Sequence, residues 1–457
     1  MRVMVLAANF ITIPYPVYPL GAATAAETAR RHGHEVKLLD LMAENGFGGY
    51  NPELIKQAVS DFQPDCLGLS LRNLESADSS NADEHWSLDL VKQIITDIRR
   101  FTDAPVVMGG AGFSLMPGLI LEHTGADYGL IGEGEDIWPE FLETLAQNKF
   151  EAGSLNTAVP GATQISHYDP ALVRRYLDQG GLIGVQSKRG CPLKCLYCSY
   201  PLLEGRRIRP RPIEEVLADI EQLCAIIEKP PIAFADAVFN DPAGHWRTLL
   251  EAIAARGLKI SWTAFFQPAE FQKGDLELIK ASGAAGLEFG TDASNDAALK
   301  GLNKSFDFNL VREIQEKCAA AQIPTAHYII FGGPGETPAT VEEGIANLDQ
   351  LPGCVAFIST GLSIYPGTPL FALAREEGLI ETANDLKHPL FYYSPAIDPG
   401  WLDARLQKAF GLHRDRLYPP SRAIERTVAL RRMGFRGILW DTLIGAGERS
   451  AKVSANA

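Results

Sequence analysis

Three closely spaced cysteines are the residues of this sequence with the clearest capacity for chemistry. Cys191, Cys195 and Cys198 form the pattern C-x3-C-x2-C. Thiolate sulfur is a soft ligand that selects iron–sulfur clusters or zinc. A structural zinc site normally takes a fourth Cys or His. The nearest further candidates are distant in sequence: His167, Cys224 and His245. Three thiolates on a four-iron cluster leave one iron open for a substrate or cofactor, so the pattern favours such a cluster over zinc.

The composition indicates a folded protein of a reducing compartment. The chain has 457 residues, of which 46% are hydrophobic and 21% charged, so it can bury a core and should form two or three domains. Seven cysteines are few for this length and odd in number, which argues against a disulfide framework. The four outside the triplet stand in apolar contexts typical of core residues: Cys66, Cys224, Cys318 and Cys354.

Net charge and hydropathy exclude two function classes. The formal charge is −14, whereas a general nucleic-acid binder should be basic. No run of 18 apolar residues occurs, so we expect no membrane span. The N-terminus has the composition of a strand and lacks the cleavage site of a signal peptide. We therefore expect a cytoplasmic protein.

The first third of the chain must form the scaffold for one ligand site. Short apolar runs alternate with helical patterns, with strands expected at 2–7, 35–39 and 66–71, a further apolar run in 105–113 and one more short strand within 124–135. This alternation predicts an α/β, doubly wound, Rossmann-like domain over 1–147. Its ligand crevice should lie at the carboxyl ends of the strands, in the loops 8–15, 71–80, 109–114 and 132–135.

The second unit must carry the cysteine loop. Periodicity is weak over 148–181, which we take as a linker. Strands are then expected at 182–187, 232–235, 259–264, 286–290, 326–331 and 355–364. With helices between them, they predict a full or partial (β/α)6 barrel over 182–384, whose chemistry lies at the carboxyl ends of the strands. The cysteines directly follow its first strand. The remainder, 385–457, is mostly helical in pattern.

The cysteine loop resembles the signature of the radical S-adenosylmethionine (radical SAM) superfamily, C-x3-C-x-aromatic-C, with Tyr197 in the aromatic position. The resemblance implies a [4Fe–4S] cluster held by the three cysteines, with its open iron chelating S-adenosylmethionine. It further implies reductive cleavage of that cofactor to a 5′-deoxyadenosyl radical. The protein would orient and shield this chemistry.

Further segments similar to the superfamily follow in the family's order. They are 234–240, 286–292, 299–304, 331–337 and 365–369. The resemblance assigns Tyr197, Asp236 and Glu288 to the S-adenosylmethionine site. Gln267 departs from the family, because relatives often have a cofactor-contacting Arg near this position.

The N-terminal segments 109–112 and 128–135 resemble those of the cobalamin-binding radical SAM class. This implies cobalamin as a third cofactor, although the signature D-x-H-x-x-G with its axial His is absent. The glycines are equally compatible with simple strand-to-helix turns or with a domain that has lost cobalamin. We place these residues at the cobalamin site: Asn9, Arg72, Asn73, Gly109, Gly110, Gly132, Glu133 and Gly134.

The resemblance predicts a cobalamin-dependent radical SAM methyltransferase acting on an unactivated carbon of a lipid-like or secondary-metabolite substrate. The alternative is a cobalamin-free or non-methylating radical SAM enzyme that catalyses cyclisation, dehydrogenation or rearrangement. A third possibility is a non-catalytic protein with a structural cluster. The expected partners are a small-molecule or lipid-like substrate and a reducing electron donor such as flavodoxin or ferredoxin, without nucleic acid. The sequence assigns no catalytic side chain.

Two basic stretches and one histidine stay open at this stage. The segment 206–211 is either a loop anchor or a cationic wall near an anionic ligand. The segment 405–436 carries nine Lys or Arg and two acids, which fits a solvated helix face or a peripheral membrane contact. His327 is either a core residue or faces the barrel interior.

Overall fold

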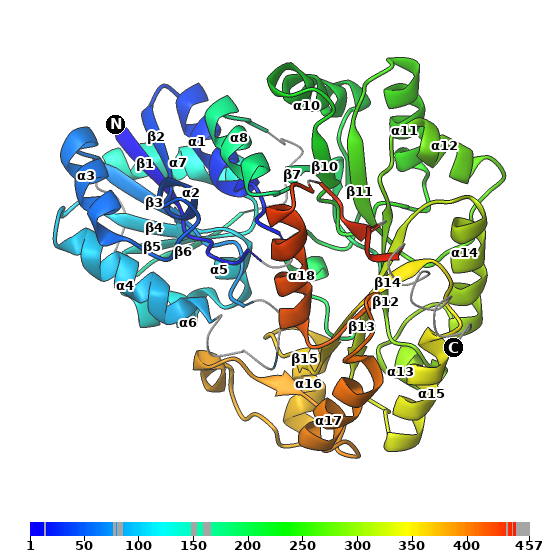
Figure 1. Ribbon diagram of the computed structural model, residues 1–457. Helices are drawn as coiled ribbons and strands as arrows, with labels where there is room; N and C mark the ends of the chain where they lie inside the picture. The colour runs from blue at the N-terminus through cyan, green and yellow to red at the C-terminus, as the bar shows by residue number, and fades with distance from the viewer. Residues whose placement is uncertain are drawn as a thin grey trace.

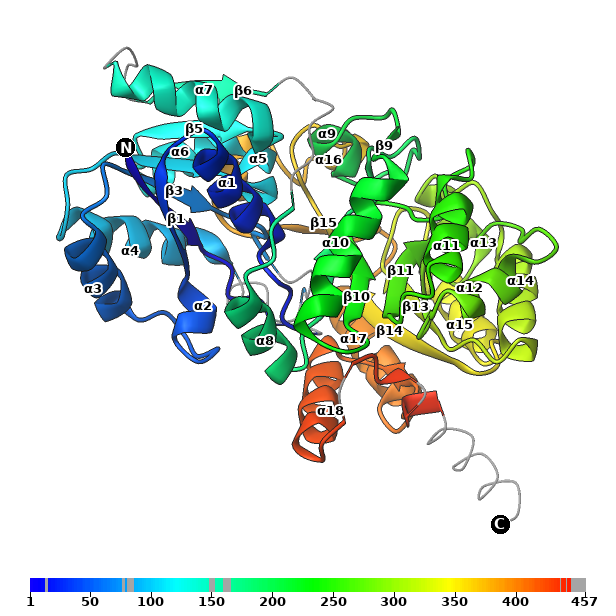
Figure 2. The same cartoon turned by 90° about the horizontal axis from the view of Figure 1, so that it is seen from above.

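Two parallel sheets, each covered by helices, make up the molecule (Figure 1). The computed structural model describes residues 1–12, 15–75, 79, 86–147, 153–158, 166–435, 437–440 and 442–444. The predicted linker is thus described only in part, and Arg436 of the basic segment lies outside these residues. The N-terminal half and the cysteine-bearing half lie side by side, with their sheets in separate layers (Figure 2).

The N-terminal half is the predicted doubly wound domain. Its sheet has the order β2-β1-β3-β4-β5-β6, and every pairing is parallel. The strands are β1 Arg2–Ala7, β2 Glu35–Asp40, β3 Cys66–Ser70, β4 Val106–Gly109, β5 Tyr128–Ile131 and β6 Leu155–Thr157. The helices are α1 Leu20–Arg31, α2 Leu41–Glu44, α3 Pro52–Phe62, α4 Ser87–Arg99, α5 Ala111–Leu115, α6 Pro117–Thr124 and α7 Gly134–Ala146. Strand β6 lies within the segment taken as a linker, because three residues show too little periodicity to be recognised without their partner β5.

The second half is a partial barrel. Its sheet has the order β17-β14-β13-β12-β11-β10-β7, again with parallel pairing throughout. The strands are β7 Ile183–Val185, β10 Pro231–Phe234, β11 Ser261–Phe266, β12 Leu287–Asp292, β13 Thr325–Phe331, β14 Cys354–Thr360 and β17 Arg416–Leu417. The helices are α10 Ile213–Ile226, α11 His245–Ala255, α12 Asp275–Ala281, α13 Asp296–Gly301, α14 Phe308–Ala320, α15 Pro338–Leu348 and α16 Pro369–Glu376. Strands β7 and β17 are its edges, so the predicted barrel is confirmed in its partial form.

The C-terminal region is less independent than its helical pattern indicates. Besides α17 Pro399–Phe410 and α18 Pro420–Arg432, it contains β16 Phe391–Tyr392, which pairs with β15 Leu362–Ser363. Strand β17 extends the barrel sheet beside β14. Both strands are two residues long, and such lengths have no periodic signature. The proposed boundary after residue 384 therefore passes through structure that the two sides share.

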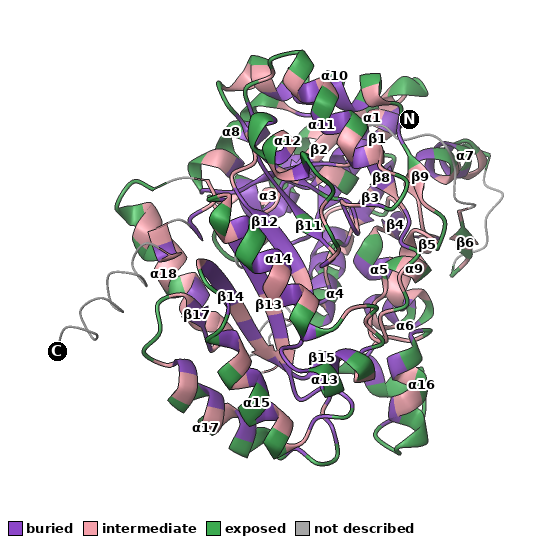
Figure 3. Cartoon of the chain, turned by 90° about the vertical axis from the view of Figure 1, so that its right-hand side faces the viewer, coloured by how far each residue is buried: buried purple, intermediate pink, exposed green. Residues whose placement is uncertain are grey.

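Buried strands and half-buried helices form the core (Figure 3). One apolar cluster runs from the N-terminal sheet into the barrel, since Met4 and Leu69 belong to the same cluster as Ile329 and Ile358. Helix α8 Pro170–Asp178 contributes to the contact between the halves. Its Tyr176 hydroxyl donates to Asp40 at 2.6 Å. No helix among the described residues is long and apolar enough to cross a bilayer.

Candidate active site

A cavity of about 1120 Å³ opens where the two halves face each other. Its wall includes loops at the carboxyl ends of strands from both sheets, where α/β proteins place their ligands. Cys191, Cys195 and Cys198 line it, as do all eight residues that were predicted for the N-terminal half. Sequence segments more than a hundred residues apart thus share one chamber.

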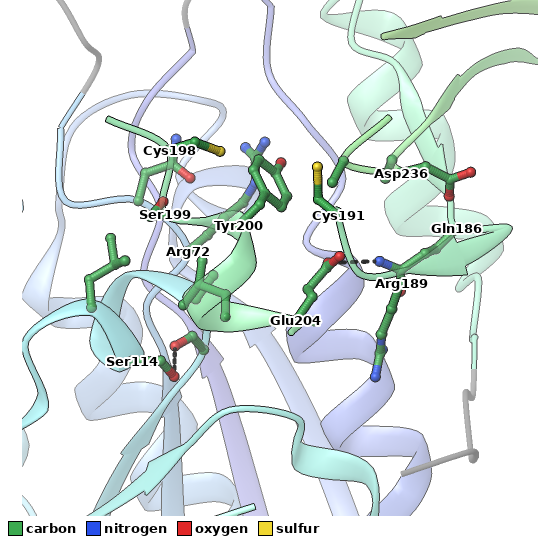
Figure 4. A pocket seen from close by; sticks show the side chains of 18 of the residues that line it. Arg72, Ser114, Gln186, Arg189, Cys191, Cys198, Ser199, Tyr200, Glu204 and Asp236 are labelled. Atoms are coloured by element: carbon green, nitrogen blue, oxygen red, sulfur yellow. Dashed lines mark hydrogen bonds between the residues drawn. The ribbon is translucent and has the colours of Figure 1, made fainter. Parts of the chain in front are cut away.

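The cysteine loop leaves strand β7 through a short antiparallel hairpin. Strand β8 Lys188–Arg189 pairs with β9 Arg209–Pro210, and α9 Tyr200–Leu203 lies between them. All three cysteines are free thiols. Figure 4 shows the sulfur atoms of Cys191 and Cys198 facing the cavity, with Tyr200 drawn between them. No group of three His, Cys, Asp or Glu side chains in the described part of the chain is arranged around a single metal ion.

Burial raises the pKa of the Cys191 thiol and raises the pKa of Cys198 to about 12. Without a metal these thiols are therefore protonated at neutral pH. Metal binding to thiols requires the thiolate and releases protons. The Nζ of Lys304 lies 3.4 Å from the Sγ of Cys195, so a positive charge stands beside the position where a thiolate would form. The donor set fits an iron–sulfur cluster, in which each thiolate bonds a separate iron and the three need not meet at one point.

Asp236 fixes the start of the cysteine loop. Its Oδ1 accepts from the backbone N–H groups of Ser187 (2.7 Å) and Lys188 (3.2 Å). Its Oδ2 accepts from Ser187 Oγ and from Lys188 Nζ at 2.9 Å. Lys188 is 1% exposed and also donates to the carbonyl of Phe239 at 2.8 Å. Asp236 lines the cavity, but its oxygens are committed to the protein, so its contribution is to position the loop.

Tyr197 belongs to a second buried group. Its hydroxyl donates to Asp292 Oδ2 at 2.5 Å, and Asp292 forms an ion pair with Lys304. Asp292 has a φ of 62°, in a conformation that costs energy for a non-glycine residue. This conformation coincides with a register shift between Phe289 and Asp292. Tyr197, the aromatic residue of the signature, lines the cavity wall and is held there by its hydrogen bond to Asp292.

Glu288 does not line the cavity. Its carboxylate accepts hydrogen bonds from the hydroxyls of Tyr328 (2.8 Å), Thr263 (3.0 Å) and Tyr15 (3.4 Å). Burial raises its pKa. Its predicted contact with S-adenosylmethionine is not supported by this placement, because these hydroxyls occupy its carboxylate, whereas Gly290 and Asp292 of the same strand line the wall.

His327 is a core residue. It is fully buried and stacks on Phe289, with its ring nitrogens within 2.8 Å of Thr291 Oγ1 and 2.9 Å of Gln315 Oε1. The structure thus decides between the two alternatives that the sequence left open.

The glycines after β4 let two loops of the chain pack closely together. Gly110 has a φ of 96°, and a Cβ there would lie 2.6 Å from the carbonyl oxygen of Leu71. At Gly112 a Cβ would lie 3.1 Å from the backbone of Arg72. These contacts bring the loop after β3 against the loop after β4. Together with Gly109, Gly132 and Gly134 they leave the strand ends open to the cavity.

Two polar side chains at these strand ends point to a missing ligand. Asn9 is 8% exposed, and neither its Oδ1 nor its Nδ2 has a hydrogen-bond partner. Buried amides without partners are uncommon in folded proteins. Arg72 reaches into the cavity beside Tyr200 (Figure 4) and forms no ion pair among the described residues. Asn73 lines the same wall. This set fits a large polar cofactor at the predicted place.

Glu133 lies at the predicted place, and its carboxylate is part of an ion-pair network. Its carboxylate accepts from Arg209 Nη1 at 2.9 Å and pairs with Arg189 Nη1 at 3.1 Å. Arg189 also binds Glu135 through two hydrogen bonds of 3.2 and 2.5 Å. The network ties the loop after β5 to the hairpin that carries the cysteines. Glu133 lines the cavity, but its charge holds the two halves together.

The basic stretch 206–211 divides into different roles. Arg209 and Arg211 are engaged, Arg211 with Asp219 at 2.6 Å. Arg206 and Arg207 are exposed and do not line the cavity, so they are not the predicted cationic wall. Sequence reasoning missed Arg189, Asp292 and Lys304. Asp292 and Lys304 lie in the family-like segments 286–292 and 299–304, but their contacts with the cysteine loop, like that of Arg189 with Glu135, join residues far apart in sequence.

In the segment 405–436 several of the cations are used within the protein. Arg416 donates to the carbonyls of Cys354, Leu348 and Leu351. Arg405 pairs with Glu342. Leu412 and Met433 are 95% and 73% exposed. A membrane contact through this segment stays a prediction.

Comparison with known proteins decides the class. Residues 7–142 match the B12 binding domain family, and residues 185–348 match the radical SAM superfamily. The chain belongs to the cobalamin-dependent radical SAM methyltransferase class. The cofactors of this enzyme are a [4Fe–4S] cluster, S-adenosylmethionine and cobalamin. The cobalamin-free alternative is thereby set aside.

Curated relatives agree with this membership, and a solved structure shares the fold. The enzyme is 25% identical to tryptophan 2-C-methyltransferase of Streptomyces laurentii over 78% of this chain and 72% of the relative. It is 28% identical to hopanoid C-3 methylase of Methylococcus capsulatus, over 53% of this chain and 46% of the relative. Its fold is similar to the radical S-adenosylmethionine methyltransferase TsrM from Kitasatospora setae, solved with cobalamin and a [4Fe–4S] cluster. That comparison gives a TM-score of 0.83 at 23% identity, covering 100% of this chain and 99% of the other.

Proposed function

We propose that this enzyme methylates an unactivated carbon of a bulky, largely apolar substrate, either lipid-like or a secondary metabolite. The observation that carries the proposal is the single cavity lined by both the cysteine loop and the strand ends of the B12-binding half. A methyl carrier and a radical source must act on one substrate, so their sites must share a chamber closed to water.

Each side of the cavity has its own task in this proposal. Cys191, Cys195 and Cys198 hold the cluster, and Tyr197 packs beside S-adenosylmethionine. Asn9, Arg72 and Asn73, with the glycines of the strand ends, hold cobalamin. When bound, the cluster with S-adenosylmethionine supplies one-electron cleavage chemistry and cobalamin supplies the methyl group. The chain's own residues bind these groups, orient them and exclude water.

The substrate class follows from the wall residues that are not assigned to a cofactor. Apolar side chains line it, among them Leu74, Leu115, Phe265, Phe306 and Ile330. Its charged residues are mostly paired, as Asp292 is with Lys304 and Arg189 is with Glu135. Such a wall favours a ligand that buries apolar surface. Relatives named as a tryptophan 2-C-methyltransferase and a hopanoid C-3 methylase support a ring-containing substrate of this kind.

The experiment begins with anaerobic reconstitution. We expect four irons and one cobalamin per chain, and we expect the triple variant Cys191→Ala/Cys195→Ala/Cys198→Ala to lose iron and keep cobalamin. The reduced enzyme should then transfer the label of methyl-deuterated S-adenosylmethionine to an apolar compound in a lipid extract. Iron retained by the triple variant would refute the ligand assignment. Label found only in polar compounds would refute the substrate class.

A further inference from the structure

Three cations form an exposed patch over the cysteine loop. Between Cys191 and Ile208 the chain has four charged residues, and the three that are exposed are all positive: Lys194, Arg206 and Arg207. The fourth, Glu204, turns inward and accepts from Gln186 Nε2 at 3.2 Å and from the backbone N–H of Gly190 at 3.0 Å (Figure 4). No cation of the patch forms an ion pair with any described residue.

The patch lies directly on the backbone that carries the cluster ligands. The Nη1 of Arg206 donates to the carbonyl of Leu193 at 3.4 Å, and the N–H of Cys191 donates to the carbonyl of Gly205 at 3.0 Å. The backbones of Gly190 and Arg207 are in such close contact that a Cβ on Gly190 would lie 2.1 Å from the Arg207 carbonyl oxygen. Pro192 and Lys194 are themselves exposed. Because Pro192 and Lys194 also line the cavity, the cysteine loop reaches from the cavity to the exposed surface at this patch.

We propose that Lys194, Arg206 and Arg207 form the docking surface for a small acidic one-electron carrier protein. The inference rests on the proposed cluster at Cys191, Cys195 and Cys198. The carrier gives one electron to the cluster and is itself oxidised by one electron, and no bond forms or breaks in this step. Electron transfer needs a short path, and this patch lies on residues in direct contact with the cysteine loop.

Charge complementarity identifies the partner. The chain as a whole carries −14, so it repels an acidic protein over most of its surface. The patch is a local exception, which orients an approaching acidic carrier towards the cluster. Three cations on a net negative protein are too few to hold a polyanion such as a nucleic acid, whose binding grows with each phosphate neutralised.

The test measures the rate of cluster reduction rather than methyl transfer. The holoenzyme is mixed anaerobically with photoreduced flavodoxin at low ionic strength, and bleaching of the cluster absorbance is followed by stopped flow. We expect Arg206→Glu/Arg207→Glu to lower the second-order rate constant about 10-fold or more. The loss should shrink as salt rises towards 0.15 M, where charges are screened within about 8 Å.

Matched controls separate docking from assembly. Arg414→Glu/Arg432→Glu makes the same change of net charge on exposed positions of the C-terminal region, beside α17 and α18 and across the molecule from α9 and β9 (Figure 2), and should reduce at the wild-type rate. Photoexcited 5-deazariboflavin, a small reductant that needs no docking, should reduce all variants equally. The milder Arg206→Gln/Arg207→Gln should give an intermediate rate if the charge reversal prevents folding.

Several results would overturn the proposal. One is an unchanged flavodoxin rate in Arg206→Glu/Arg207→Glu, and another is an equal loss in the remote control. If the double variant instead lost binding to phosphatidylglycerol vesicles with its flavodoxin rate intact, the patch would be a lipid contact. Absence of a reducible cluster in the wild type would contradict the proposed function itself and is visible with 5-deazariboflavin alone.

Discussion

The ion pair between Arg189 and Glu135 should couple the two cofactor loops. Arg189 immediately precedes Gly190 and Cys191, and Glu135 lies in the first turn of α7, directly after the glycine loop of the B12-binding half. Their side chains are 13% and 4% exposed. Burial alone lowers the pKa of Arg189, but the carboxylates of Glu135 and Glu133 outweigh it, and the net pKa is raised. The pair is therefore ionised, bidentate and largely desolvated, which is the strong form of such contacts.

The magnitudes follow from what each substitution leaves behind. Arg189→Gln leaves Glu135 buried without its cation, which should cost about 3–5 kcal/mol of unfolding free energy. Glu135→Gln costs less, about 2 kcal/mol, because Arg189 keeps its contact with Glu133 at 3.1 Å. The double variant should lose less than the sum of the two. We expect a coupling energy of about 2 kcal/mol.

The assay is urea unfolding of the cofactor-free protein, followed by tryptophan fluorescence, with cobalamin titration in parallel. The control is Asp136→Asn, an exposed neighbour of Glu135 in the same helical turn, which should change the free energy by less than about 0.5 kcal/mol. We also expect Arg189→Gln to weaken cobalamin binding although the residue belongs to the other half. Additivity within about 0.5 kcal/mol, or equal costs for the two single variants, would show that the network does not join the halves.

Three further predictions address single elements. Gly110→Ala should cost about 1–3 kcal/mol of unfolding free energy and weaken cobalamin binding, because its φ of 96° and the 2.6 Å approach of the Leu71 oxygen exclude a side chain. The control Gly118→Ala in α6, where no atom lies near the Cβ, should be neutral or stabilising. Equal effects of the two variants in urea unfolding would contradict this account of Gly110. Burial lowers the pKa of His327 to about 3, so as pH falls below about 6.5 the unfolded chain takes up a proton that the folded chain cannot, and stability is lost. Between pH 7 and pH 5 this loss should be roughly 2 kcal/mol and absent in His327→Gln, and the same slope in both proteins would assign it to another group. Lys304→Gln removes the cation 3.4 Å from Cys195 and leaves Asp292 without its ion-pair partner, so the midpoint potential of the cluster should become more negative in a redox titration monitored by electron paramagnetic resonance. The control Lys300→Gln, on the exposed surface of α13, should leave the potential unchanged. An unshifted potential in Lys304→Gln would place the cluster elsewhere.

Local chemistry of the sequence determined the class of this protein and most of its scaffold. Soft ligands at fixed short spacing define a cluster loop whatever surrounds them, and apolar periodicity defines buried parallel strands, so Cys191, Cys195 and Cys198 and the two α/β halves were predictable. Gly110 after β4 was predictable as a turn residue for the same reason, since a positive φ depends on the local backbone alone.

Tertiary structure alone decided which polar residues face the ligands and which hold the protein. Glu133, Asp236 and Glu288 all looked like ligand-binding acids. Their partners, Arg209, Lys188 and Tyr328, stand 76, 48 and 40 residues away. A buried charge is stable only with such a partner, and no pattern along the chain shows which cation or hydrogen-bond donor it will meet. The same reason hid Lys304 beside Cys195, 109 residues apart. The types of the reacting groups are a property of the sequence, whereas their pairing exists only once the two sheets have packed against each other.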